Sequence, residues 1–178
     1  MHLDKSVHIS VVSAGDLSAQ ITGFGELLHA CVHQGASIGF ILPFSQHDAE
    51  SYWQDRIIPA LQKPGLIMLA ARKNSLLAGT VQLDYDTMPN QPHRAEVRKL
   101  MVHPTFRRQG IARLLMNEIE QQAYRLNRSL LTLDTRTGDA AEPLYTSLGF
   151  RISGVIPGYC LDPFEDKLDS TTIMYKPL

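Results

Sequence analysis

One stretch of the sequence determines the predicted fold: His103-Pro104-Thr105-Phe106-Arg107-Arg108-Gln109-Gly110-Ile111-Ala112-Arg113. A strand-like run, 95–102, precedes them, and an amphipathic helix pattern, 110–126, follows. The free N–H groups and the dipole at a helix start favour an anion, and Gly110 has no Cβ to keep a ligand away. This junction, with Arg107, Arg108 and Arg113, predicts a turn that holds a polyphosphate. A solvated basic helix start is the alternative.

The segments around this turn predict an α/β fold with a mixed sheet. A strand at 129–135 follows the helix pattern, so it is expected to run parallel to the strand at 95–102. Further strands are expected at 7–12, 66–71, 76–85, 150–155 and 171–175. Helices are expected at 17–31, at 140–148, and from Ser45 to Pro64, where Pro59 would kink or end the helix. The prediction is one domain, residues 1–178, with six to seven strands and about four helices.

Composition narrows the function classes. The chain has 178 residues, 44% of them hydrophobic, and a formal net charge of −1, so neither a nucleic acid nor an anionic membrane is an expected partner. The start, 1–6, is not followed by an apolar run, which predicts no signal peptide and a cytoplasmic location. The two cysteines are far apart in the sequence, and of the seven histidines only His29 and His33 are four residues apart, so no metal is expected.

Two motifs resemble those of the GCN5-related N-acetyltransferases (the GNAT family). The pattern Val102-x-Pro104-x-x-Arg107-x-x-Gly110-Ile111-Ala112 is similar to the acyl-CoA signature of that family, and Ala141-Glu142-Pro143-Leu144-Tyr145-Thr146-Ser147-Leu148-Gly149-Phe150 is similar to a second motif. The order of the expected elements also resembles the GNAT fold. Many members carry an asparagine where this chain has Gly138, so the side-chain contact of that asparagine to the cofactor is expected to be missing or replaced.

The resemblance implies an N-acetyltransferase that uses acetyl-CoA as its co-substrate. It assigns cofactor contacts to the end of the strand and to the turn, at Leu100, Met101, Val102, Arg107, Arg108, Gln109, Gly110, Ile111, Ala112 and Arg113. A backbone N–H of 100–102 would stabilise the charge that develops on the thioester oxygen. Because proteins of this fold often form homodimers, a homodimer is a candidate assembly.

Further blocks resemble the acetyltransferases that confer tabtoxin resistance on plant-pathogenic pseudomonads. They are 35–40, 94–102, 133–135, 157–160 and 172–176. This resemblance implies a small amine or amino-acid-like acceptor, direct transfer of the acetyl group, and a role in antibiotic or toxin resistance. Acetylation of protein lysines or N-termini is a second hypothesis, and a non-catalytic acyl-CoA-binding module is a third.

Three residues are candidates for the chemistry. An alkyl amine has a pKa near ~10, so a base must remove its proton at neutral pH. Glu96 matches the family's strand-borne glutamate base, although a solvated glutamate paired with a neighbouring arginine is the alternative. Asp134, at a strand end, could bind the amine or act as the base in its place, unless it is a turn residue. Tyr145 matches the family's tyrosine acid, which would donate to the leaving thiolate, and a core tyrosine is the alternative.

Other expectations concern the strand face and the acceptor. Regular alternation places Glu96, Arg98, Leu100 and Val102 on one face of strand 95–102, and Val97, Lys99 and Met101 on the other. Beside Asp134, the candidates for substrate binding are side chains that could line a pocket: His33, Trp53 and Tyr159, with Tyr85 and Cys160 as weaker candidates.

Overall fold

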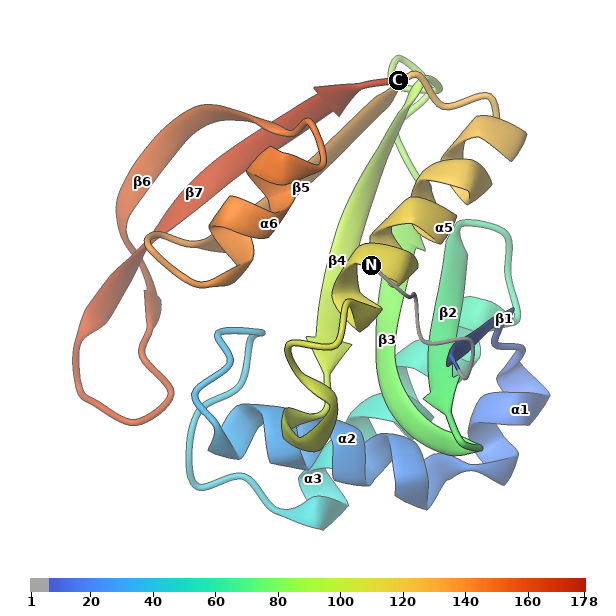
Figure 1. Ribbon diagram of the computed structural model, residues 1–178, viewed down its shortest axis with the longest axis vertical. Helices are drawn as coiled ribbons and strands as arrows, with labels where there is room; N and C mark the ends of the chain where they lie inside the picture. Colours follow the sequence, from blue (N-terminus) through green and yellow to red (C-terminus); the bar gives the residue numbers. More distant parts are fainter. Residues whose placement is uncertain (1–6) are drawn as a thin grey trace.

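A computed structural model describes residues 7–178; the stretch 1–6, on which the signal-peptide prediction partly depends, lies outside the described residues. The described chain forms one seven-stranded sheet with the order β1-β2-β3-β4-β5-β7-β6 (Figure 1). The strands are β1 (Val7–Val11), β2 (Leu66–Lys73), β3 (Leu76–Asp84), β4 (Arg94–Val102), β5 (Leu130–Arg136), β6 (Arg151–Leu161) and β7 (Leu168–Pro177). The expected mixed α/β sheet of six to seven strands is confirmed.

The sheet joins two antiparallel halves through one parallel pair. Strands β1 to β4 pair antiparallel in sequence order, and β5, β7 and β6 form a second antiparallel group. Strand β5 runs parallel to β4, as expected for strands joined by a crossover helix. This helix is α5 (Ile111–Arg125), which begins one residue after the predicted start.

Helix α5 and α6 (Ala141–Ser147) cover one face of the sheet. Ile111, Leu115 and Ile119 of α5 are buried against strand residues such as Val81 and Leu131. Their three- and four-residue spacing is the amphipathic pattern of a helix that packs on a sheet. This core fixes where α5 begins, and therefore where the predicted phosphate-binding turn lies.

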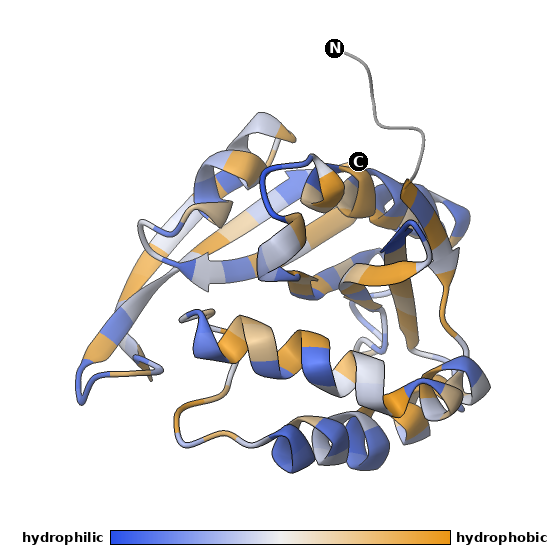
Figure 2. Cartoon of the chain, turned by 60° about the horizontal axis from the view of Figure 1, so that its bottom comes forward, coloured by the Kyte–Doolittle hydropathy of each residue, from blue (hydrophilic) through white to orange (hydrophobic). Residues whose placement is uncertain are grey.

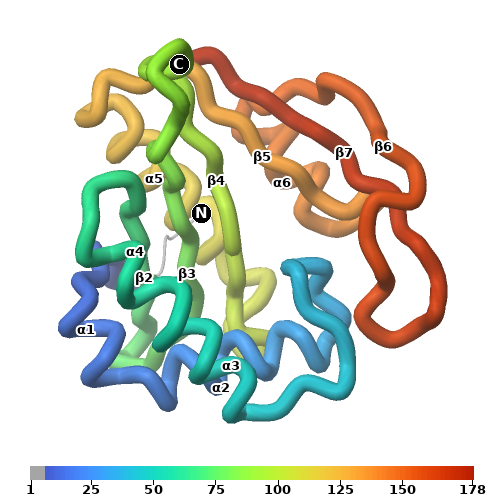
Figure 3. The backbone as a smooth tube through the Cα atoms, turned by 180° about the vertical axis from the view of Figure 1, so that it is seen from behind, coloured from blue at the N-terminus to red at the C-terminus, as the bar shows by residue number. Residues whose placement is uncertain are grey.

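The other face is covered by α1 (Ala14–Ala19), α2 (Ile21–His33), α3 (Gln46–Tyr52) and α4 (Ile58–Leu61). In Figure 2 this layer lies below the sheet, and Figure 3 shows it from behind. The expected single helix at 17–31 is two helices that meet at Gln20, whose backbone is not helical. A tertiary contact holds this junction, because Arg72 Nη2 of β2 donates to Gln20 Oε1 at 2.7 Å. Within residues 7–178 no helix is long and apolar enough to cross a membrane.

The helical run that begins after Ser45 does not end at Pro59. A π-helical turn, η1 (Trp53–Ile57), joins α3 to α4, and the run continues through Pro59 to Leu61. Proline has no N–H to donate to the preceding turn, and the wider π turn lies directly before it. Pro59 therefore alters the helix type without ending the helix. The run does end before Pro64, as expected.

Candidate active site

The parallel strands β4 and β5 separate from each other along their length. Only Arg94, Ala95 and Glu96 have register partners on β5; beyond Glu96 the two strands diverge, as Figure 1 shows. The backbone of β4 past Glu96 therefore presents an edge within the sheet that β5 does not cover. A ligand with an extended arm could pair with such an edge.

A β-bulge interrupts β4 at this point. Arg98 pairs with Gln82 of β3, but Met101 pairs with Thr80. Between these two pairs β4 advances by three residues and β3 by only two, so β4 contains one extra residue. Lys99 has a φ of 52°, a left-handed conformation that is uncommon for a lysine. An extra residue reverses the alternation of side chains beyond it.

The bulge overturns the predicted faces of this strand. Leu100 and Val102 pack against the core under α5, whereas Met101 is buried in the core under α2. Glu96 and Arg98 therefore do not share a face with Leu100 and Val102, contrary to the regular alternation. The physical reason is the inserted residue at Lys99, for which the sequence has no glycine or other turn signal.

The turn before α5 has the geometry of an anion site. Gly110 is the N-cap of α5 with a φ of 79°, and a Cβ built there would meet nothing within 4 Å. Arg108 is also left-handed, with a φ of 63°. The backbone N–H groups of Ile111, Ala112 and Arg113 lie in the first turn, where no intrahelical partner is available. The space around Gly110 leaves them open to a ligand.

The side chains of this turn divide into paired and unpaired ones. Arg107 Nε donates to Val102 O at 3.3 Å, Gln109 Nε2 donates to Thr105 O at 3.2 Å, and Arg113 Nη2 donates to Ser147 Oγ of α6 at 2.8 Å. Among the described residues Arg108 has no hydrogen-bond or ion-pair partner. Its guanidinium is the cation of this turn that is free to meet a phosphate.

A cavity of about 310 Å³ lies where β4 and β5 separate. We call it the β4–β5 cavity. Its lining comes from β4, β5, α6, the loop after α2 and strand β6, and includes Ser37, Glu96, Lys99, Asp134, Tyr145 and Tyr159. The three predicted catalytic residues therefore meet in one cavity, although Glu96, Asp134 and Tyr145 come from three different elements.

Glu96 and Asp134 differ in their surroundings. Burial raises the pKa of the half-buried Glu96 carboxyl; Arg98 opposes the rise, while the nearby Asp134 and Asp84 carboxylates add to it. Asp134 is exposed at the end of β5 and accepts a hydrogen bond from Thr171 Oγ1 at 3.1 Å. A carboxyl with a raised pKa is the better proton acceptor near neutral pH, which favours Glu96 as the base.

Tyr145 is buried in α6, with only 7% of its surface exposed. Burial raises the pKa of its phenol, and the Asp139 and Asp134 carboxylates raise it further, so the hydroxyl stays protonated. Its ring packs edge-on against Phe150 at 5.9 Å between centroids. The hydroxyl has no hydrogen-bond partner within residues 7–178, and its residue lines the β4–β5 cavity. It is therefore available as a donor to a ligand there.

The predicted substrate-binding residues are separated by the fold. Tyr159, Asp134 and Cys160 line the β4–β5 cavity. Trp53 is fully buried, and its Nε1 donates to Phe24 O at 2.8 Å, so it is a core residue and not part of the predicted pocket. His33 is exposed at the end of α2, stacked on His29, and does not line this cavity. Tyr85 instead lies under the guanidinium of Arg128.

Lys99 is a residue of this region that sequence reasoning missed. Its ammonium lies over the rings of Phe40 and Tyr52, at 5.5 and 5.9 Å from their centroids, and donates to Ile38 O. Burial lowers its pKa, and the nearby Arg98 lowers it further. Only the bulge turns Lys99 toward the loop after α2, and the sequence carries no signal for that bulge.

Known proteins resemble this chain over most of its length. The sequence model described as "Acetyltransferase (GNAT) family" matches residues 29–150. An IAA acetyltransferase of Azospirillum brasilense is 31% identical over 122 residues, which cover 68% of this chain and 74% of that protein. An uncharacterized N-acetyltransferase in the hisH-hisA intergenic region of the same organism is 28% identical over 114 residues, or 63% and 66% of the two chains. That second match spans just under two thirds of the relative's length.

Solved structures share the fold. A GCN5-related N-acetyltransferase from Kribbella flavida superposes with a TM-score of 0.78 at 19% identity, covering 98% of this chain and 99% of that one. The structure of yncA from Salmonella typhimurium, solved with its cofactor acetyl-CoA, superposes with a TM-score of 0.75 at 17% identity, covering 98% and 95%. The chain belongs to the acetyltransferase (GNAT) family, and its enzyme class is that of the acetyl-CoA-dependent N-acetyltransferases.

The described residues fit acetyl-CoA as the co-substrate. The turn of Arg108 and Gly110 offers an unpaired cation and free N–H groups to phosphates, and the uncovered edge of β4 offers backbone groups to an extended arm. Within residues 7–178, no group of three or more His, Cys, Asp or Glu side chains could hold a metal ion. The absence of a metal from the reaction stays a prediction.

Proposed function

We propose that this protein transfers the acetyl group of acetyl-CoA directly to the amine of a small, amino-acid-like acceptor. The observation that carries the proposal is the β4–β5 cavity, in which a half-buried carboxyl of raised pKa, a protonated buried phenol and a second carboxylate meet beside an uncovered strand edge. Acetyl-CoA supplies the acetyl group as a thioester. The protein's part is to place the amine, accept its proton and stabilise the departing sulfur.

In this proposal Glu96 accepts the proton from the acceptor's ammonium, directly or through a water. The neutral nitrogen then forms the N–C bond as the C–S bond breaks, and the second proton that the nitrogen loses on becoming an amide passes to the leaving thiolate. Backbone N–H groups on the uncovered edge of 100–102 stabilise the negative charge that develops on the carbonyl oxygen. Asp134, on the facing strand, holds the ammonium before it loses its proton.

Tyr145 stabilises the sulfur that leaves. Its pKa is raised, so it transfers a proton less readily than an ordinary phenol does, and a hydrogen bond to the thiolate is its main contribution. Its hydroxyl has no competing partner within the described chain. The buried setting strengthens such a hydrogen bond, because the local dielectric constant is low.

A small acceptor is favoured over a protein because hydrogen bonds join the segments beside the cavity to one another. Leu42 N, in the loop after α2, donates to Pro163 O in the β6–β7 hairpin at 3.1 Å. Arg136 Nη2 donates to Gly35 O of the same loop at 3.1 Å. These contacts tie the loop after α2 to β5 and to the β6–β7 hairpin, and a cavity of about 310 Å³ suits a small acceptor better than a peptide. Acceptors of this class include β-lactam-like amino-acid toxins, whose acetylation would detoxify them.

The test is a thiol-release assay with purified protein, acetyl-CoA and a panel of amines, amino acids, β-lactam-like antimetabolites and peptides. Release of CoA with small amino-acid-like acceptors, and not with peptides, is the expected result. Release with peptides alone would support acetylation of proteins instead. If the protein binds CoA but no acceptor releases it, a non-catalytic acyl-CoA-binding module is the better description.

We also propose a homodimer that pairs through β6, an edge strand of the sheet. It exposes large apolar side chains at Ile152, Val155, Ile156, Tyr159 and Leu161. An exposed edge strand of this kind is suited to pairing with a second copy. Sedimentation analysis of the wild type and of Val155→Lys tests it: a wild-type monomer contradicts the proposal. The cytoplasmic location stays a prediction.

A further inference from the structure

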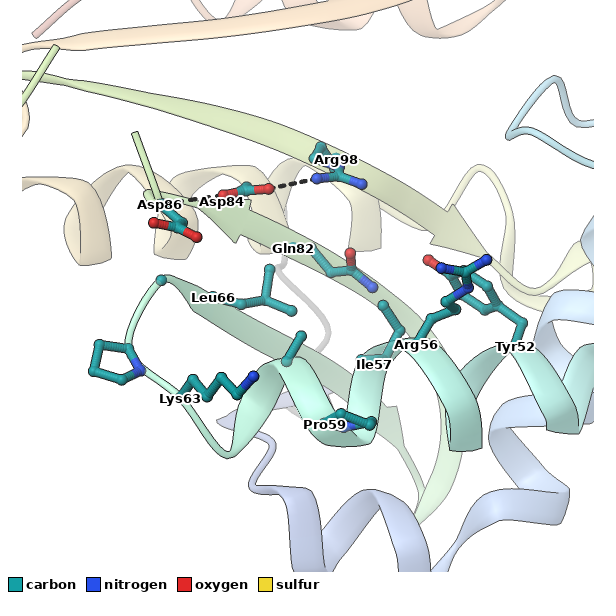
Figure 4. A pocket seen from close by; sticks show the side chains of 13 residues that line it. Tyr52, Arg56, Ile57, Pro59, Lys63, Leu66, Gln82, Asp84, Asp86 and Arg98 are labelled. Carbon is teal, nitrogen blue, oxygen red and sulfur yellow. Dashed lines mark hydrogen bonds and ion pairs between the residues drawn. The ribbon is translucent and has the colours of Figure 1, made fainter. Parts of the chain in front are cut away.

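A second pocket lies on the same face of the sheet as Glu96. We call it the Gln82 pocket; its volume is about 560 Å³, and it opens between β2–β4 and the run from α3 to α4. Figure 4 shows its lining side chains: Tyr52, Arg56, Ile57, Pro59, Lys63, Leu66, Gln82, Asp84, Asp86 and Arg98. None of the predicted catalytic residues lies in it. It adjoins the β4–β5 cavity through Arg98, which lines both.

Gln82 is the unusual residue of this pocket. Its side chain is buried, with 1% of its surface exposed, and its Nε2 has no hydrogen-bond partner in the described chain. Tyr52 lines the same pocket: burial raises the pKa of its phenol, and the Gln82 amide opposes the rise, but Nε2 of Gln82 makes no hydrogen bond in the described chain. A buried donor without a partner is costly, so its presence points to a ligand acceptor.

The charges around Gln82 favour an anion. Arg98 is paired with Asp84, whereas Arg56 and Lys63 have no ion-pair or hydrogen-bond partner among residues 7–178. Against these two unpaired cations the pocket has one unpaired carboxylate, Asp86. Figure 4 shows Gln82 reaching from β3 toward the turn of Arg56, with Asp86 at the other end of the pocket. The donors at the Gln82 end are therefore an amide, a guanidinium and a phenol.

The local fold explains why Arg56 faces this pocket. It lies in η1, where the π turn inserts an extra residue while Trp53 and Ile57 stay buried. Single π turns inside helices occur frequently at functional sites. The planar guanidinium of Arg56 suits a carboxylate, which it can bind through two hydrogen bonds.

We propose that the Gln82 pocket binds the carboxylate of the acceptor while its amine lies at Glu96. This inference rests on the proposed function and names its substrate class, the ω-amino carboxylates. Glu96 and Arg98 are two residues apart on one face of β4, and Gln82 is the register partner of Arg98. The rise along a strand and the spacing of neighbouring strands therefore place Glu96, which takes the amine, on the order of 8 Å from Gln82, which takes the carboxylate. An α-amino acid is too short to span both, so its amine would have to lie at the end of a side chain.

The experiment compares acceptors of matched length with and without a carboxylate. The series β-alanine, γ-aminobutyrate, δ-aminovalerate and ε-aminocaproate is set against ethylamine, propylamine, butylamine and pentylamine in the thiol-release assay. The expected result is at least a tenfold higher kcat/KM for ε-aminocaproate than for pentylamine, with the advantage falling as the chain shortens. Equal values for the two series would overturn the proposal.

Single substitutions test where the carboxylate of the acceptor binds. Arg56→Gln should reduce the carboxylate advantage at least fivefold and leave kcat/KM for pentylamine within twofold of wild type. Arg125→Gln removes an exposed arginine at the end of α5, outside both pockets, and serves as the matched control; it should change neither value. If acceptors with a carboxylate keep their higher kcat/KM in Arg56→Gln, the carboxylate does not bind in the Gln82 pocket.

A binding measurement separates this inference from the proposed function. Glutarate, a dicarboxylate without an amine, is titrated calorimetrically into wild type, Arg56→Gln and Gln82→Leu in the presence of CoA. We expect binding to wild type and at least fivefold weaker binding to both variants. If no amine releases CoA but glutarate binds in this pattern, the proposed function fails and the anion site stands. If amines react but glutarate does not bind, the pocket inference fails alone.

Discussion

Arg136, at the end of β5, donates through Nη2 to the carbonyl oxygen of Gly35 in the loop after α2, at 3.1 Å. The same guanidinium lies 3.4 to 3.5 Å from the carboxylates of Asp139, Asp162 and Asp169. One side chain therefore joins β5, the loop after α2 and the β6–β7 hairpin. These are three of the segments that enclose the β4–β5 cavity. Arg136 is a positioning residue, because it does not itself line that cavity.

Arg136→Ala should loosen this enclosure. The Asp162 and Asp169 side chains are only 10% and 17% exposed, and the substitution leaves both without their main cation. We expect a lower free energy of unfolding, faster hydrogen exchange in the loop after α2, and a higher KM for the acceptor. Urea unfolding and exchange measurements test this. Arg125→Ala, which removes an exposed ion pair with Glu118, is the control and should cost about 0.5 kcal/mol or less.

Most of the fold could be predicted because local patterns and global topology agree. The second helical segment begins after Ser45 as predicted, with a capping box of Ser45 and Asp48, whereas the first begins at Ala14, three residues before the predicted start, after a capping box of Ser13 and Asp16. The junction at Gln20 could not be predicted, because the side chain that contacts it, Arg72, is 52 residues away in the sequence. The π turn before Pro59 was also missed, since helical periodicity assumes one constant number of residues per turn.

The site could be predicted where a motif fixes a position. Glu96, Asp134 and Tyr145 come together in one cavity, as their placement on strand ends and the second motif suggested. Trp53 was placed wrongly, because an aromatic residue on a helix face has the same pattern whether it binds a ligand or fills the core. Lys99 and Gln82 could not be found at all. Their roles depend on a β-bulge and on an unsatisfied amide, and neither has a sequence signal.

The pH dependence of turnover should distinguish Glu96 from Asp134 as the base. Burial raises the pKa of Glu96, and the Asp134 carboxylate contributes to the rise. Activity that needs ionised Glu96 increases as the pH rises through this pKa. Asp134→Asn removes a neighbouring negative charge, which lowers the pKa of Glu96 and moves the acid limb of kcat/KM to lower pH. If the limb disappears in Asp134→Asn and persists in Glu96→Gln, Asp134 is the base.

Glu96→Gln should reduce kcat by at least about 100-fold without destabilising the protein. A carboxyl whose pKa is raised by folding contributes stability that is present at low pH and is lost as the pH rises through the folded-state value. At neutral pH the neutral glutamine avoids the cost of a half-buried charge, so its unfolding free energy should equal or exceed that of wild type. Urea unfolding at pH 4 and pH 7.5 tests the sign of the difference in unfolding free energy between the variant and wild type. A variant that is less stable at the higher pH only would contradict it.

Tyr145→Phe isolates the hydroxyl from the ring. The ring keeps its edge-on contact with Phe150, and the hydroxyl has no partner in the described chain, so we expect folding stability and CoA affinity to be unchanged. Turnover should fall by at least about tenfold, because a hydrogen bond to a charged group contributes about 1.5–3 kcal/mol. The loss should be smaller with acyl thioesters that have a more acidic leaving thiol, because these need less stabilisation. Unchanged kinetics would remove Tyr145 from the mechanism.

Arg108→Ala tests the predicted phosphate-binding turn. Alanine keeps the Cβ, so the left-handed backbone is no more strained than before, and only the unpaired guanidinium is lost. A hydrogen bond to a charged group contributes about 1.5–3 kcal/mol, which corresponds to a rise in KM for acetyl-CoA of at least about tenfold. The value of kcat should change little, and the effect should shrink at high salt. Arg151→Ala should leave this KM unchanged.

Gly110→Ala separates backbone conformation from space. Both Gly110 and Gly154 have nothing within 4 Å of an added Cβ, but only Gly110 has a positive φ, 79°. Gly110→Ala should therefore lower the unfolding free energy by about 1–2 kcal/mol, whereas Gly154→Ala should not be destabilising. Gly110→Asn should cost less than the alanine, because asparagine tolerates the left-handed region better. Equal losses for Gly110→Ala and Gly154→Ala, measured by urea unfolding, would show that φ is not what requires a glycine at the start of α5.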